Sequence, residues 1–268
     1  MTARDIDAEV ELAGVLLRSR GKTRQIVLNE PDRRNPMSPA VMQGLTMACD
    51  RIEADDDVRA VILTGAGSAF SAGGDLPYNN ANLQGPTERQ HAFLTGLYKP
   101  FLRILDLPMP TIAAINGVAV GGGLAIAMLC DIRLVAEDAK LVTAFANIGF
   151  APGLGLTYSL ERAVGLSKAA ELLYSGATLS GAEADVLGLA RAVPLDQLDE
   201  QAGDLADRIA SMSPTVNRMV KGAMFTGYRT ELKQRLERDI LAQVVTSVGS
   251  DYQDFLASLN ERAGKAGK

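Results

Sequence analysis

The sequence is poor in the residues that most often mark redox, metal or nucleic-acid chemistry. Its 268 residues include two cysteines and one histidine. Cys49 and Cys130 lie in apolar stretches without CxxC spacing, so the sequence predicts neither a disulfide framework nor a zinc site. We expect reduced thiols in a cytoplasmic protein. The net charge of −5 gives no basic excess, which argues against nucleic acid as a partner.

Targeting and membrane signals are also weak. Residues 1–11 are acidic and lack the apolar stretch of a signal peptide. Residues 112–130 carry no charge and are long enough to cross a bilayer. This segment contains the triplet Gly121, Gly122 and Gly123, which is costly in a helix and typical of a special turn. We therefore expect no membrane span.

The first half of the sequence alternates strand and helix patterns. The strands expected are 10–18, 23–28, 58–64, 111–115 and 132–136. Helices are expected from Ser38-Pro39, from the end of a polar loop at 79–87 to about residue 105, and over 124–130. This alternation predicts an α/β fold with mostly buried strands. From residue 167 onward the patterns are nearly all helical, with N-cap candidates at Ser167, Ser180 and Ser213.

Two glycine-rich turns, at 65–75 and 116–123, each follow an apolar strand. Glycines let a ligand approach backbone N–H groups closely, and the second turn leads into a helix whose first N–H groups lack partners. Two such groups aimed at one point would stabilise an oxyanion. A phosphate loop is disfavoured because neither GxxxxGK[ST] nor GxGxxG is present in the required setting. The remaining interpretation is that these glycines serve only to let a helix and a strand pack closely.

Four segments resemble motifs of one family. Residues 68–76 (SAFSAGGDL) are similar to "AFCAGxDL", and residues 115–131 to "NGxxxGGGxxxxxxCD". Residues 28–36 (LNEPDRRNP) are similar to "LNRPexxNAL", and residues 149–155 (GFAPGLG) to "GLxPGxGG". The segments agree in order and spacing, so the chain resembles the crotonase (enoyl-CoA hydratase/isomerase) superfamily over about residues 10–262.

The resemblance implies an α/β fold of the crotonase type, a spiral of ββα units with a helical C-terminal trimerisation region. We assign residues 1–195 to the core and 196–268 to the helical region. It further implies an acyl-CoA substrate of fatty-acid metabolism, with coenzyme A as part of the substrate and no other cofactor or metal. The assembly expected is a homotrimer or a hexamer built as a dimer of trimers. By position, the oxyanion-hole N–H groups fall on Gly74 and Gly122. The substrate- and CoA-binding positions are Arg34, Pro36, Ala72, Asp75, Leu76, Gly121 and Phe145.

The sequence departs from the family at its acid–base positions. The two glutamates that hold water in family hydratases are replaced by Ala125 and Phe145, and the aspartate of isomerase relatives by Gly153. Asp75 and His91 are speculative replacements as acid or base. Four other polar residues are weaker candidates for this role: Ser71, Tyr98, Thr143 and Asn147.

Two interpretations stay open. The first is an enzyme of the enoyl-CoA hydratase/isomerase type that stabilises a thioester enolate. Its reaction would be hydration with reduced machinery, or isomerisation, thioester hydrolysis or decarboxylation. The second is an acyl-CoA-binding protein without turnover. A dinucleotide-dependent oxidoreductase is disfavoured because the fingerprint is absent.

Overall fold

A computed structural model describes residues 6–266 of the chain, so the first five residues of the 1–11 segment lie outside the described residues. The strands are β1 (Ala8–Leu12), β2 (Val15–Arg20), β3 (Thr23–Leu28), β4 (Pro36–Met37), β5 (Ala60–Gly65), β6 (Ala69–Ser71), β7 (Gly73–Gly74), β8 (Thr111–Ile115), β9 (Val118–Val120), β10 (Ile132–Ala136), β11 (Lys140–Val142), β12 (Thr178–Ser180) and β13 (Arg191–Val193). The α-helices are α1 (Pro39–Glu53), α2 (Leu76–Asn82), α3 (Thr87–Asp106), α4 (Gly122–Met128), α5 (Leu156–Val164), α6 (Leu166–Ser175), α7 (Gly181–Val186), α8 (Leu198–Ser211), α9 (Pro214–Ser247) and α10 (Ser250–Ala266). The 3₁₀ turns are η1 (Pro31–Arg33), η2 (Ala146–Ile148) and η3 (Leu195–Gln197).

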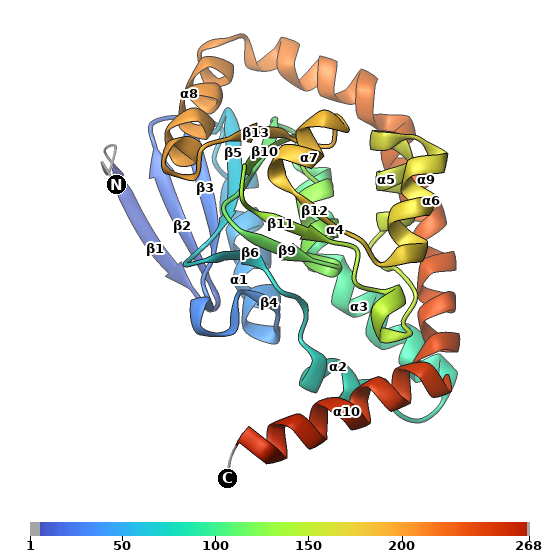
Figure 1. Ribbon diagram of the computed structural model, residues 1–268. Helices are drawn as coiled ribbons and strands as arrows, with labels where there is room; N and C mark the ends of the chain where they lie inside the picture. Colours follow the sequence, from blue (N-terminus) through green and yellow to red (C-terminus); the bar gives the residue numbers. More distant parts are fainter. Residues whose placement is uncertain (1–5, 267–268) are drawn as a thin grey trace.

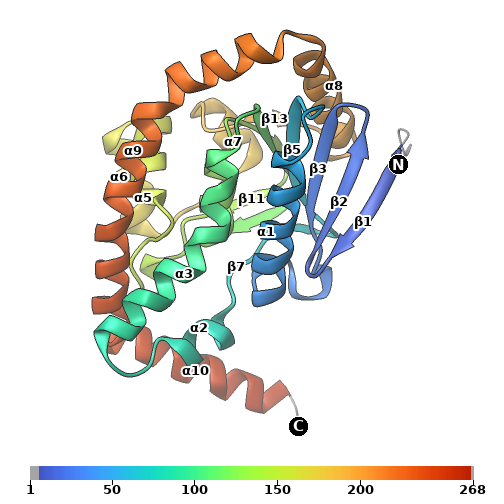
Figure 2. The same ribbon diagram turned by 180° about the vertical axis from the view of Figure 1, so that it is seen from behind.

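The largest sheet has the strand order β1-β2-β3-β5-β8-β10-β13. The β1–β2 and β2–β3 pairs are antiparallel, and every later pair is parallel. Helix α1 contacts β1, β2 and β3, whereas α8 contacts β3, β5, β8 and β10 (Figures 1 and 2). Parallel strands that lie under helices must be apolar along most of their length, as β5 and β8 are.

A second sheet brings the two glycine-rich turns together. Its order is β12-β11-β9-β6, and the short pair β4-β7 lies beside it. Strand β6 belongs to the first turn and β9 to the second, and they pair in parallel from Ala69 opposite Val118 (Figure 1). Segments that are some fifty residues apart in the sequence, Gly73 and Gly122 among them, are thus held against each other.

Several helix starts predicted from the sequence are confirmed by their hydrogen bonds. The Ser38 side chain accepts from the Val41 N–H with Pro39 in the first turn, and Ser213 caps α9 in the same way. Ser180 forms a complete capping box with Glu183. The Ser167 prediction is wrong, because α6 begins at Leu166 behind Gly165.

Three other expectations need correction. The expected strand 10–18 is two strands, because the backbone turns at Ala13, which has a φ of 48°, and Gly14. The expected loop 79–87 begins inside α2, whose start is capped by the Asp75 side chain. The segment after residue 167 is not wholly helical, since it supplies the edge strands β12 and β13. Strands of three residues give too little periodicity to be recognised in a sequence.

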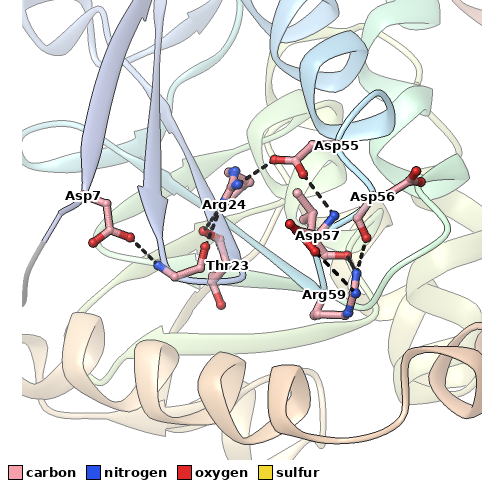
Figure 3. A network of polar contacts seen from close by, with 9 residues as sticks. Asp7, Thr23, Arg24, Asp55, Asp56, Asp57 and Arg59 are labelled. Carbon is pink, nitrogen blue, oxygen red and sulfur yellow. Dashed lines mark hydrogen bonds and ion pairs between the residues drawn. The ribbon is translucent and has the colours of Figure 1, made fainter.

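A polar network ties the antiparallel edge to the core (Figure 3). The Arg24 guanidinium on β3 donates to the Asp55 carboxylate at 2.6 Å, and Asp55 also accepts from the Asp57 N–H at 3.0 Å. These bonds hold the pKa of Asp55 below its ordinary value, first through the Asp57 N–H and then through Arg24. The network joins the turn between α1 and β5 to the β2–β3 hairpin.

The C-terminal helices wrap the rest of the molecule. Helix α9 runs along one side in Figure 1, contacting α3 and α5, and α10 crosses beneath α2. Lys221 of α9 is buried and pairs with Asp131 at 2.8 Å while donating to the Met109 carbonyl. No helix in the described part of the chain combines the length and apolar character that a bilayer crossing needs.

Candidate functional site

A cavity of about 240 Å³ opens where the two glycine-rich turns meet α2, α3, α9 and α10. Its lining residues are Met37, Ala72, Gly74, Leu76, Asn79, Leu97, Tyr98, Val120, Gly121, Gly122, Ala144, Phe145, Ile148, Phe150, Gly153, Leu154, Gln243, Tyr252 and Phe255. Four of the predicted binding positions line this cavity, namely Ala72, Leu76, Gly121 and Phe145, and so do both predicted oxyanion glycines, Gly74 and Gly122. Pro36 lies in β4, which pairs with β7 at Gly73.

The backbones of the two glycine turns approach within contact distance at this cavity. A Cβ built on Gly73 would lie 3.2 Å from the Gly122 nitrogen, and one built on Gly122 would lie 3.7 Å from the Gly74 nitrogen. Gly73 has a φ of 83°, which disfavours any other residue. The N–H groups of Gly74 and Gly122 thus belong to neighbouring backbone segments at one wall.

The helix that follows contributes to the same wall. Gly121 is the N-cap of α4, with a φ of 49°, and its N–H donates to the Val142 carbonyl at 2.8 Å. Gly122 is the first residue of the helix, where N–H groups have no partner within the helix. A Cβ on Gly121 would lie 3.4 Å from the Phe145 ring, so this ring packs directly on the turn.

The side chains of Tyr98 and Gln243 occupy the space that a side chain at position 153 would need. The Tyr98 hydroxyl donates to Gln243 Oε1 at 2.6 Å, and Gln243 Nε2 donates to the Ala151 carbonyl at 3.1 Å. A Cβ on Gly153 would lie 2.2 Å from the Tyr98 oxygen and 2.3 Å from Gln243 Nε2. The structure therefore leaves no room for a side chain at position 153.

The titratable side chains among the described residues that line the cavity are two tyrosines, Tyr98 and Tyr252. Among the described residues that line it there is no carboxylate, imidazole, amine, guanidinium or thiol. Burial raises the pKa of Tyr98 above its ordinary value and also raises that of Tyr252. Both side chains are therefore neutral at physiological pH, and neither is a base there.

The speculative acid–base residues lie elsewhere. Asp75 caps α2 by accepting from the Tyr78 N–H, and its carboxylate pairs with Arg33 at 2.8 Å. His91 lies on α3 with a third of its side chain exposed, 3.1 Å from Glu237 of α9. Neither residue belongs to the cavity lining.

Three of the weaker polar candidates, Ser71, Thr143 and Asn147, donate to backbone carbonyls. The Ser71 hydroxyl is fully buried and donates to the Asn35 carbonyl at 2.7 Å. Thr143 donates to the Leu172 carbonyl and Asn147 to the Gly176 carbonyl, so both fasten the turn after α6. These residues build the walls around the site.

The CoA positions outside the cavity adjoin it through the backbone. Arg34 is exposed, and its carbonyl accepts from the Ala72 N–H at 2.7 Å. Pro36 pairs with Gly73 across β4 and β7. The sequence did not identify Gln243, Tyr252 and Phe255 as lining residues. The local sequence around them shows helical periodicity. This periodicity predicts a helix but does not indicate that the helix packs over a site formed by residues about 100 positions earlier.

Comparison with known proteins gives one consistent relationship. A family model described as "Enoyl-CoA hydratase/isomerase" matches residues 20–262. A Thermus thermophilus protein with the provisional name enoyl-CoA hydratase is 40% identical over 203 residues, which cover 75% of this chain and 80% of that protein. A crystal structure of enoyl-CoA hydratase from Bacillus anthracis matches with a TM-score of 0.75 and 32% identity, over 93% of this chain and 96% of that one. A monofunctional enoyl-CoA isomerase from M. smegmatis matches with a TM-score of 0.68 and 35% identity, over 80% of this chain and 93% of that one.

Proposed function

Because the chain belongs to the enoyl-CoA hydratase/isomerase family, we propose that it binds acyl-CoA thioesters in the cavity and stabilises the enolate with the Gly74 and Gly122 N–H groups. The observation that carries this proposal is the contact between the two glycine turns, where a Cβ on Gly73 would lie 3.2 Å from the Gly122 nitrogen. N–H groups that are fixed before the reaction stabilise the charge that develops on a thioester oxygen. The surrounding apolar lining strengthens that interaction by excluding water.

Coenzyme A itself is assigned to the outer edge of this site. In this proposal the adenine and pantetheine follow Arg34, Pro36, Ala72, Asp75 and Leu76. The support is that Arg34 is exposed and its carbonyl accepts from the Ala72 N–H, while Ala72 and Leu76 both line the cavity. Asp75 would then act by holding α2 in place rather than by moving a proton, since its carboxylate is committed to Arg33 and to the helix start.

Among the described residues, the cavity lining lacks the acid–base groups that hydration needs. Adding water across a double bond needs a base for the water and an acid for Cα. Phe145 stands in the cavity as an inert ring, Ala125 is buried in α4, and Gly153 lies under Tyr98 and Gln243. Loss of general acid–base groups typically lowers a rate by about 10²–10⁴. The same lining supports a second candidate, acyl-CoA binding without turnover.

A paired binding and turnover measurement tests this proposal. Butyryl-CoA binding is followed by calorimetry, and crotonyl-CoA hydration by loss of the conjugated absorbance. We expect clear binding of butyryl-CoA together with hydration about 10²–10⁴-fold slower than that of a relative with both glutamates. Absence of acyl-CoA binding would refute the proposed function, and hydration at the relative's rate would refute the account of the missing carboxylates.

We further propose a homotrimer or a hexamer, and a cytoplasmic location. Support for the assembly comes from large apolar side chains that are exposed along α9: Val216, Met219, Met224, Leu241 and Val245. Exposed apolar surface is typical of contacts between proteins. Light scattering of the purified protein measures the mass of the assembly and so tests this proposal. The location is supported by the free, buried thiols of Cys49 and Cys130.

A further inference from the structure

A second cavity of about 240 Å³ lies outside the proposed acyl-CoA site. It is lined by the end of α4 and the residues that follow it, by Arg133 of β10, and by side chains of α5 and α9. Within the described part of the chain, no residue lines both cavities. The proposed function therefore leaves this second cavity without a role.

Arg133 brings to this cavity a positive charge that no carboxylate partner neutralises. Its Nε atom donates to the Leu189 carbonyl at 2.7 Å, and its Nη1 atom donates to the Cys130 carbonyl at 2.9 Å. Among residues 6–266 its Nη2 atom has no hydrogen-bond partner, although it is not one of the polar atoms that the protein fully encloses. Because Arg133 lines the cavity, this side of the guanidinium is open to a ligand there.

The pKa of Arg133 is consistent with a charge that lacks a partner. Burial lowers this pKa, because surroundings of low polarity disfavour the charged form. Arg33 behaves in the opposite way, since its hydrogen bond to the Asp75 carboxylate raises its pKa. An anion beside Arg133 would supply the compensation that Arg33 receives from Asp75.

A second arginine lies at the same cavity. Arg162 of α5 is exposed, lines the cavity and forms no ion pair with any residue that the structure describes. Burial raises the pKa of Tyr228, whereas its hydrogen bond to Ser159 and the charges of Arg133 and Arg162 oppose this rise. Both guanidinium groups are therefore close enough to act on one hydroxyl group. Two positive charges converge on this space.

The remaining polar groups of the lining are already paired. The Asp131 carboxylate forms an ion pair with Lys221 at 2.8 Å, so its negative charge is neutralised. The Tyr228 hydroxyl donates to Ser159 at 2.9 Å, and the Ser159 hydroxyl donates to the Gly155 carbonyl at 2.9 Å. The hydrogen-bond donors left for a ligand are therefore those of the two guanidinium groups.

The rest of the lining limits the size and the character of the ligand. Five lining side chains are apolar: Met128, Leu129, Ala163, Met224 and Phe225. Such a wall favours a hydrocarbon body over a fully polar ion. The planar fork of a guanidinium matches a carboxylate. A volume of about 240 Å³ suits a small molecule, because sites for drug-sized ligands span roughly 300–1,000 Å³.

We infer that this second cavity binds a small organic carboxylate. Arg133 and Arg162 hold its carboxylate group, and the apolar wall holds its hydrocarbon body. The ligand lies against the end of α4, the helix that begins at Gly122. The inference does not depend on acyl-CoA binding, since the two cavities have separate linings.

The test titrates four small molecules into the purified protein by calorimetry: acetate, butyrate, butanamide and inorganic phosphate. Butyrate should bind about tenfold more tightly than acetate, because each buried methylene group strengthens binding about fourfold. Butanamide has the same size without the charge and should not bind measurably. Phosphate has the charge without an apolar body and should bind more weakly than butyrate.

Two variants connect this binding to the cavity. Arg162→Gln should weaken butyrate binding about tenfold, the typical effect of one lost hydrogen bond to a charged group. Ala163→Phe fills the cavity without changing a charge and should weaken butyrate binding as well. Arg208→Gln, at an exposed position of α8 outside the lining, removes the same charge and is the matched control. It should bind butyrate as the wild type does.

Three outcomes would overturn the inference. One is equal affinity for butyrate in the wild type and in Arg162→Gln. Another is tighter binding of phosphate than of butyrate, which would show that the cavity takes inorganic anions. The third is the absence of carboxylate binding to the wild type. If Arg162→Gln then also lowered the mass measured by light scattering, a carboxylate of a second copy would be the occupant, since Met224 also belongs to the apolar surface proposed for assembly.

Discussion

At the scale of single residues, Gly153 shows why an isomerase-type carboxylate has no place here. The Tyr98 hydroxyl and the Gln243 amide already occupy the volume above its Cα, and both are tied into hydrogen bonds. The glycine therefore belongs to an arrangement in which two neutral, hydrogen-bonded side chains lie over position 153.

Substitution of Gly153 by aspartate should destabilise the fold. The new side chain would overlap Tyr98 and Gln243, and overpacking of this kind typically costs about 1–3 kcal/mol. We expect a lower urea midpoint for Gly153→Asp, partly restored in Gly153→Asp/Gln243→Ala, where space is returned. Gly96→Asp on α3 is the control, because nothing lies within 4 Å of a Cβ there. An unchanged midpoint in Gly153→Asp would contradict the packing that the structure shows.

The motifs predicted inert residues at Ala125, Phe145 and Gly153, but not which side chains would surround them in the fold. Tyr98 and Gln243 are 145 residues apart, and no local pattern relates them. The helix at Asn79 was not predicted for another reason. The polar neighbourhood of Asn79 suggested a loop, whereas the Asp75 cap begins a helix there.

At the scale of elements, α9 fastens the loop that precedes α5. Asp239 on α9 accepts from the Gly155 N–H and the Thr157 hydroxyl, each at 3.1 Å. Burial raises the pKa of Asp239 to about 6, against the opposing effect of these hydrogen bonds. Gln243 lies one turn further along the same helix, so this anchoring also positions the polar pair in the cavity.

The raised pKa of Asp239 predicts a pH dependence of stability. The folded protein keeps this proton to a higher pH than the unfolded chain, so the contribution is complete below about pH 4 and is lost as the pH rises through 6. A rise in the pKa from 3.8 to about 6 corresponds to about 3 kcal/mol in the free energy of unfolding. Asp239→Asn should gain stability over the wild type at pH 7 by up to that amount and match it near pH 4.

Urea unfolding at both pH values measures this difference, with Asp254→Asn, at an exposed position on α10, as the control. If the wild type and Asp239→Asn differed in free energy of unfolding by the same amount at both pH values, Asp239 would not titrate as described.

Elements with strong local signals were predictable and weak ones were not. Ser38-Pro39 and Ser213-Pro214 begin helices where expected, and the strands 111–115 and 132–136 match β8 and β10. The strands β12 and β13 have three residues each and are stabilised by pairing with distant strands. Their formation depends on the sheet, which the local sequence does not contain.

At the scale of the whole molecule, the second sheet explains how two ordinary turns become one site. Strands β6 and β9 pair in parallel and bring Gly74 and Gly122 to one wall. Helices α3, α9 and α10 then cover that wall with Tyr98, Gln243 and Tyr252. The motifs in the sequence predicted that the two glycine turns form one site. The helices that cover these turns could not be predicted, because their packing depends on contacts between residues far apart in the chain.

The most direct test of the central claim measures enolate stabilisation without any need for acid–base residues. A 3-oxoacyl thioester such as acetoacetyl-CoA forms an enolate with its own ultraviolet absorbance, so its pKa can be titrated free and bound. The wild type should lower that pKa. Gly122→Pro lacks the Gly122 N–H group and keeps only that of Gly74, so it should lower the pKa of the bound thioester less than the wild type does. An unshifted pKa in the wild type, or an equal shift in Gly122→Pro, would contradict the oxyanion site.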